Sequence, residues 1–130
     1  MFEEDLRWLF NENWRAVVKR CLLPELANAD VDQAFALMNI TGADTPNLLE
    51  RFRTAVWGRI RNEATTKRHA DSRDPYLSLV YEADTIADNL EHRQFIRTAF
   101  RRNLEAARDV HRQNGDENRA QAASDLLDRL

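Results

Sequence analysis

Apolar residues recur at steps of three and four along almost the whole chain, which places them on one face of an α-helix. The clearest case is the segment 3–22, whose periodic positions are Leu6, Leu9, Phe10, Trp14, Val17, Val18, Cys21 and Leu22. No segment of four or more residues alternates apolar and polar side chains with β-branched enrichment, so no sheet is predicted. The pattern therefore predicts an all-α protein.

Start and stop signals divide this periodic chain into separate helices. Pro24 ends the first helix, while Thr45-Pro46 and Asp74-Pro75 each join a capping side chain to a proline at the first helical position. The predicted helices cover 3–22, 46–69, 75–90, 95–111 and 116–130, and a shorter one begins at Asn28 or Asp30 and is closed by Thr41-Gly42. Residues 89–92 either break the fourth helix or continue it, so we expect five or six helices packed as a bundle.

The length of 130 residues suits one helical domain, 1–130, with one hydrophobic core. No apolar run approaches the ~18 residues of a membrane span, and the start of the chain is acidic where a signal peptide would be basic. These features predict a cytoplasmic protein with no membrane contact. Cys21 lies on the apolar stripe of the first helix and is interpreted as a small buried hydrophobe.

Residues that could carry catalysis or hold a metal are sparse. The three histidines, His69, His92 and His111, lack the spacing of metal ligands, and the chain contains no glycine-rich phosphate loop. We therefore predict no enzyme, no metal and no cofactor. A helical hydrolase or nuclease stays open as a third reading, because a nucleophile and a base can meet in three dimensions.

The segment from Arg51 to Arg73 reverses the charge of the chain, whose formal net charge is −3. It contains seven Lys or Arg residues and two acids, while Phe52, Val56 and Ile60 form its apolar stripe. Such a face can bind nucleic acid, with cations on phosphates and polar side chains on base edges. The candidate phosphate contacts are Arg59, Arg61, Lys67, Arg68 and Arg73, and the candidate base contacts are Asn62 and Thr66. The alternative is a solvated face whose arginines pair with acids elsewhere.

A second cationic set contains Arg93, Arg97, Arg101, Arg102, Arg108 and Arg112, and its first three members form a row at helical spacing of four residues. Glu105 and Asp109 are expected to pair with Arg101 and Arg112, which would make this row a solvated face. The alternative is a contact surface for an acidic partner or for nucleic acid. Trp8 and Trp57 lie off the strictest apolar stripes, so each is either partly exposed, as a stacking platform for an unpaired base, or part of a wide core.

The order of these residues resembles the core-binding and promoter-melting helical domain of bacterial sigma factors, especially the extracytoplasmic-function type. That family has a D-L/V-x-Q segment before a helix of the form F-x-x-W-L-x-x-I-A-R-N-x-A-x-D. This chain has Asp30-Val31-Asp32-Gln33, followed by Phe52, Val56, Ile60, Arg61-Asn62 and Ala64. Trp57 lies two positions after the family's tryptophan, and Thr66 stands in place of the acid. The resemblance covers residues 5–73, and the helices of 75–130 do not resemble the helix-turn-helix of such factors.

The resemblance implies a small transcription regulator. In this reading Asp30, Asp32 and Gln33 contact RNA polymerase, and the segment 59–73 contacts promoter DNA. The rival reading is a helical protein-interaction module, such as a phage or defence adaptor or inhibitor, whose row Arg93, Arg97 and Arg101 binds an acidic protein. Neither reading identifies the partner or the oligomeric state, and whether DNA is bound at all stays open.

Overall fold

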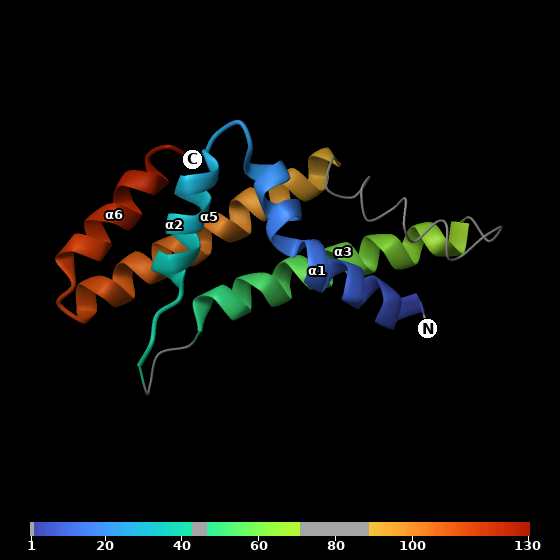
Figure 1. Cartoon of the computed structure of the whole chain (residues 1–130), viewed down its shortest axis with the longest axis horizontal. Helices are drawn as coiled ribbons and strands as arrows, with labels where there is room; N and C mark the ends of the chain where they lie inside the picture. The colour runs from blue at the N-terminus through green and yellow to red at the C-terminus, as the bar shows by residue number, and fades with distance from the viewer. Residues whose placement is uncertain (1, 43–46, 71–88) are drawn as a thin grey trace.

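The computed structural model describes residues 2–42, 47–70 and 89–130, and for residues 2 and 66–70 it describes the backbone alone. Helices account for most of these residues, and no strand occurs among them (Figure 1). The helices are α1 (Phe2–Leu22), α2 (Asn28–Met38), α3 (Leu48–Ala70), α5 (Leu90–Gln113) and α6 (Glu117–Leu127). The predicted all-α class is confirmed. The predicted helix 75–90 falls almost entirely outside the described residues.

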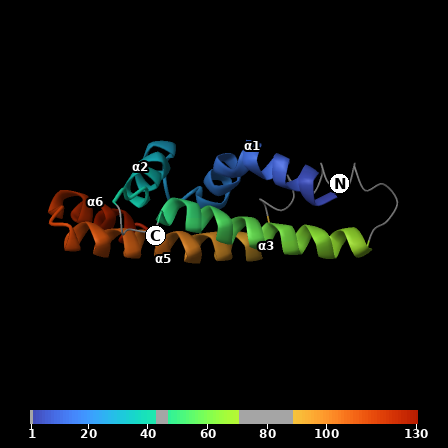
Figure 2. The same ribbon diagram turned by 90° about the horizontal axis from the view of Figure 1, so that it is seen from below.

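Helix α5 is the central element, because it contacts each of the other four helices. Helix α6 turns back along α5 to form a hairpin, and α3 lies beside α5. Figure 2 shows α1 and α2 on one side of the α3 and α5 pair. The side chains that face away from these contacts are those left available to a partner.

An aromatic cluster joins four helices at the middle of the core. Phe35 of α2, Phe52 of α3 and Phe100 of α5 have ring centroids 5.4 to 6.5 Å apart. Trp14 of α1 packs against this group, with its centroid 5.1 Å from that of Phe35. Tilted and edge-on ring pairs of this kind each contribute about 0.5–1.5 kcal/mol beyond their buried area. The cluster therefore sets the rotation of α3 and α5, and with it the direction of their arginines.

Capping side chains determine where two of the long helices begin. Asn47 Oδ1 accepts a hydrogen bond of 3.1 Å from Glu50 N, so α3 starts at Leu48 with an asparagine cap. The predicted start signal Thr45-Pro46 lies outside the described residues. Asn89 Oδ1 accepts from Glu91 N and His92 N, and α5 therefore begins at Leu90. The break that the sequence allowed at residues 89–92 therefore falls at Asn89, where α5 begins, and the predicted fourth helix before it lies outside the described residues.

The hairpin between α5 and α6 follows the sequence prediction. Gly115 has φ 79°, a left-handed conformation that favours glycine and stops α5. Asp116 then caps α6 by accepting a hydrogen bond of 3.1 Å from Arg119 N. This short turn brings α6 back against the C-terminal half of α5.

The two histidines of α5 are core residues. His111 is buried, and its Nε2 lies 2.8 Å from the carbonyl oxygen of Leu37. His92 is buried beside Glu63, with Nε2 3.8 Å from the carboxylate. Cys21 is also buried, as predicted. Across the part of the chain that the structure describes, no group of three or more His, Cys, Asp or Glu residues is arranged to hold a metal ion.

Candidate functional site

The described cations of the predicted nucleic-acid face are held in ion pairs. Arg59 Nη2 lies 3.2 Å from Glu91 Oε2 of α5, and Arg61 Nε lies 2.6 Å from Glu3 Oε1 of α1. Asn62 is exposed next to them. Both acids come from other helices, which is the arrangement expected of a solvated, paired face. The side chains of Thr66, Lys67 and Arg68, and all of Arg73, lie outside the described residues.

The acidic residues predicted to contact polymerase also have partners within the chain. Asp30 accepts a hydrogen bond from Ala27 N at the start of α2 and lies 2.8 Å from Arg129 Nη1. Asp32 lies 3.4 Å from Arg15 Nη2 and 3.7 Å from Lys19 Nζ. Gln33 is exposed. The two aspartates therefore connect α2 to α1 and to the C-terminal end of the chain.

The cationic row on α5 is paired with acids only in part. Arg97 donates a hydrogen bond to the carboxylate of Glu25, and Arg93 is half-buried. Arg101 is exposed, and so is Arg102 beside it. In the described ranges 2–42, 47–65 and 89–130, neither of these two arginines makes an ion pair. Arg101 and Arg102 therefore have no compensating acid among the residues that the structure describes.

The pairing predicted for this row is absent. Glu105 was expected to neutralise Arg101, but among the described side chains it makes no ion pair with that arginine. Asp109 pairs with Arg108 at 3.2 Å rather than with Arg112. Ion pairs between exposed side chains one turn apart contribute only about 0.3–0.5 kcal/mol, which the entropy of two long side chains can cancel.

Arg97, Arg101 and Arg102 line one groove beside α5. The groove has a volume of about 600 Å³, and its other lining residues are Gln94, Thr98, Glu105 and Leu130. The side chains of this lining include three guanidinium groups and one carboxylate, and Glu25 balances one of the three guanidinium groups. The groove is thus a positive region of a chain whose formal net charge is negative. Leu130 reaches it because α6 returns along α5.

The sequence identified part of this groove. Arg97 and Arg101 belong to the predicted row, whereas Arg93 is not among the residues that line the groove. Arg102 belongs to the wider cationic set predicted from the sequence, whereas Gln94 and Thr98 were not assigned to a site. Helical spacing could have included Gln94 and Thr98, since they precede Arg101 by seven and three residues. Leu130 could not be placed without knowing how α6 packs.

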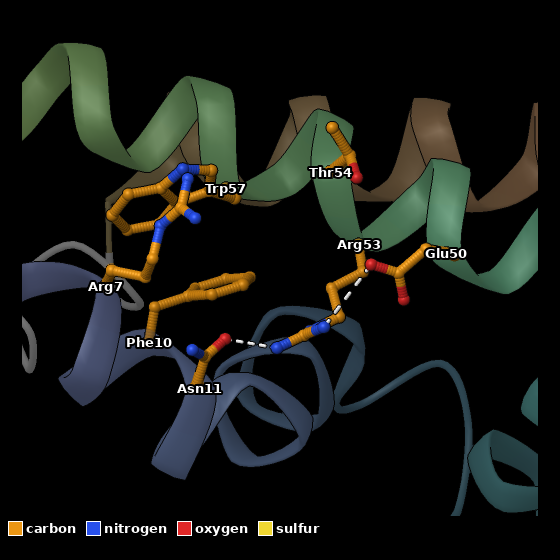
Figure 3. Close-up of a pocket in the computed structure, with 7 residues that line it drawn as sticks. All are labelled: Arg7, Phe10, Asn11, Glu50, Arg53, Thr54 and Trp57. Carbon is orange, nitrogen blue, oxygen red and sulfur yellow. Dashed lines mark hydrogen bonds and ion pairs between the residues drawn. The ribbon is translucent and has the colours of Figure 1, made fainter.

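A smaller pocket lies between α1 and α3 (Figure 3). Its volume is about 220 Å³, and it is lined by Arg7, Phe10, Asn11, Glu50, Arg53, Thr54 and Trp57. Trp57 is half-buried and packs against Phe10, with ring centroids 5.3 Å apart. The guanidinium carbon of Arg7 lies 5.3 Å from the centroid of the Trp57 ring. Trp8 is not among the residues that line the pocket, and it is 62% exposed.

Comparisons with protein-family models, with curated protein sequences and with solved structures gave no match. None of the described helices is both long enough and apolar enough to cross a membrane.

Proposed function

We propose that this protein is a helical interaction module that binds an acidic segment of a protein partner in the groove along α5. The observation that carries the proposal is the pair Arg101 and Arg102, which are exposed, make no ion pair among the described residues and line the same groove as Arg97. Arginine guanidinium groups bind carboxylates through two parallel hydrogen bonds, so the groove offers directional contacts as well as charge.

The shape of the groove favours a docked segment of a protein over a small-molecule substrate. A volume of about 600 Å³ that is open to solvent accommodates several side chains of a docked segment. Glu105 at its edge repels acids, while Gln94 and Thr98 can hydrogen-bond to a backbone or to amide side chains. These features fit a segment in which acidic residues meet Arg101 and Arg102 and neutral polar residues lie beside them.

The number of uncompensated cations favours a protein partner over DNA. Tight duplex binding typically uses six to ten phosphate contacts, and affinity falls with salt in proportion to their number. The groove supplies two unpaired guanidinium groups, which would give a salt slope of only about −1.8 for duplex DNA. A net charge of −3 further opposes a polyanion.

The test is a fluorescence-anisotropy titration with two matched peptides. One is a helical peptide with glutamates four residues apart, and the other carries glutamines at the same positions. We expect the glutamate peptide alone to bind at ~50 mM salt, where Coulomb attraction is least screened. Arg101→Gln should weaken its binding about fivefold, because one partly exposed pair contributes up to about 1 kcal/mol.

Arg51→Gln is the matched control. Arg51 is also exposed, makes no ion pair in the described part of the chain, and lies on α3 outside the groove. Its substitution removes the same charge and should leave the affinity for the peptide within about twofold of wild type. Equal binding of the two peptides, or equal losses from the two substitutions, would contradict the proposal.

The transcription regulator stays a prediction based on the resemblance to sigma factors. It assigns Asp30, Asp32 and Gln33 to RNA polymerase and the region from Arg59 to Arg73 to promoter DNA. The exposed Gln33 and the exposed Asn62 are compatible with those roles. Titrating promoter DNA and core polymerase at ~50 and ~200 mM salt tests this reading, and absence of binding to both at the lower salt would exclude it.

A further inference from the structure

The pocket between α1 and α3 contains an arginine stacked on an aromatic wall. Arg7 lies over the indole of Trp57, and Phe10 packs against the same indole (Figure 3). Stacking of this kind uses the flat face of the guanidinium and leaves the N–H groups at its edge available. Among the described residues, Arg7 makes no hydrogen bond and no ion pair. Its donors are therefore held in place by the stacking and have no partner in the part of the chain that the structure describes.

Asn11 supplies a second unused donor, one helical turn after Arg7. Arg53 donates a hydrogen bond to Asn11 Oδ1. Because a guanidinium has no acceptor, this bond requires the amide oxygen to face Arg53 and leaves the amide NH2 free for another group. Figure 3 shows the amide nitrogen turned away from Arg53. The i and i+4 spacing places Arg7 and Asn11 on one face of α1.

Arg53 acts as a fixed wall of the pocket. Its guanidinium lies over Phe10 and Trp14, with 6.0 and 5.9 Å to the ring centroids. It also lies 3.4 Å from Glu50 Oε1, so its Nη atoms are occupied by Glu50 and Asn11. The charged groups that line the pocket are therefore two arginines and one glutamate, with a net charge of +1.

These observations restrict the chemistry of a ligand. The N–H groups of Arg7 and Asn11 have no acceptor among the described residues, so they favour a ligand with two acceptor oxygens. The net charge of +1 favours a monoanion over a dianion. The wall formed by Phe10 and Trp57 favours a planar apolar group. The volume of about 220 Å³ is below the usual size of sites for drug-sized ligands, which favours a small ligand.

We propose that this pocket binds a small aromatic monocarboxylate, with its carboxylate on Arg7 and Asn11 and its ring against Phe10 and Trp57. This site is separate from the groove along α5, with which it shares no lining residue. Binding would join α1 to α3 through a ligand at a point where the two helices already contact each other.

The experiment is a titration of the isotopically labelled full chain with benzoate, followed by NMR at the indole N–H of Trp57. We expect a saturable shift at millimolar benzoate, and a much weaker response to acetate, which has no ring, and to inorganic phosphate. Benzylamine, which has the ring and the opposite charge, should not bind. The absence of a saturable shift with benzoate, or equal binding of benzylamine, would overturn the proposal.

Two substitutions test the assigned donors. Arg7→Gln should weaken benzoate binding about tenfold or more, because hydrogen bonds to charged groups are the strong ones. Asn11→Asp should weaken it at least as much, since it replaces a donor by a negative charge while keeping an acceptor for Arg53. Both residues are exposed, so thermal unfolding should be close to wild type. Benzoate affinity within twofold of wild type in both variants would also overturn the proposal.

Arg101→Gln is the control that separates the two sites. It should leave benzoate binding unchanged while weakening the acidic peptide. Conversely, Arg7→Gln should leave peptide binding within about twofold of wild type. Loss of benzoate binding in Arg101→Gln would contradict the assignment of the ligand to the pocket between α1 and α3.

Discussion

The arginines of α3 and those of α5 differ in what surrounds them, although both sets occur at helical spacing on long amphipathic helices. Arg59 and Arg61 of α3 each pair with a glutamate from another helix. Arg101 and Arg102 of α5 are exposed and make no ion pair among the described residues. The same residue type is therefore neutralised at one place and available at the other.

The difference follows from how the helices pack. Glu91, in the first turn of α5, and Glu3, in the first turn of α1, come close to the second half of α3. The groove beside Arg101 is bordered by residues of α5 itself and by Leu130. A cationic pattern on one helix thus predicts an available surface only when the neighbouring helices are known.

The largest effect is expected from breaking the core that orients both helices. Phe100→Ala should lower the free energy of unfolding by about 3–5 kcal/mol, because the ring is fully buried against Phe35 and Phe52. Urea denaturation measures this change. Thr98→Ala, at an exposed position of the same helix, should change it by no more than about 0.5 kcal/mol. Similar values for the two variants would show that the cluster does not hold α5.

An intermediate effect, on DNA affinity, is expected from removing the two acids that pair with arginines of α3. The double substitution Glu3→Gln and Glu91→Gln leaves Arg59 and Arg61 without their carboxylates, so duplex DNA should bind up to about fivefold more tightly at ~50 mM salt. Electrophoretic mobility shift measures this affinity.

The control for this experiment removes two acids that do not pair with α3. Glu12→Gln with Glu117→Gln makes the same change in net charge at exposed positions. An equal gain in DNA affinity from this control would assign the effect to net charge alone. It would then give no support to a nucleic-acid face on α3.

The smallest effect is expected on stability, where the arginines of α3 and those of α5 can be compared directly. Arg59→Gln with Arg61→Gln should lower the free energy of unfolding by up to about 1 kcal/mol, because two exposed ion pairs are lost. Arg101→Gln with Arg102→Gln removes two adjacent unpaired charges and should leave stability unchanged or slightly raise it. A larger loss from the α5 pair than from the α3 pair would reverse the comparison.

Much of the fold could be predicted because its signals are local. The apolar stripe of 3–22 became the buried face of α1, and Asp116 caps α6 as expected. The cap of α3 differs from the prediction, since Asn47 accepts the hydrogen bond from Glu50 N. Asparagine is as good a capping residue as threonine. The prediction chose Thr45 because Pro46 follows it and proline is common at the first helical position.

The candidate sites were only partly predictable because each of them is built by more than one part of the chain. The row containing Arg97 and Arg101 could be recognised from spacing, and these two residues line the groove. The expected pair of Arg101 with Glu105 did not form, because spacing permits such a pair without making it favourable. The pocket of Arg7 and Trp57 combines residues fifty positions apart, and no spacing rule connects them.

The amino-acid sequence by itself determined the all-α class, the side of each described helix that is buried and the stop at Gly115. These properties depend on interactions within a few residues, namely helical periodicity, capping and backbone conformation. The tertiary structure alone decided which arginines are neutralised, and it alone assembled the groove and the pocket. The physical reason is that ion pairs and cavities depend on where helices distant in the chain cross, and that geometry is set by packing of the whole core.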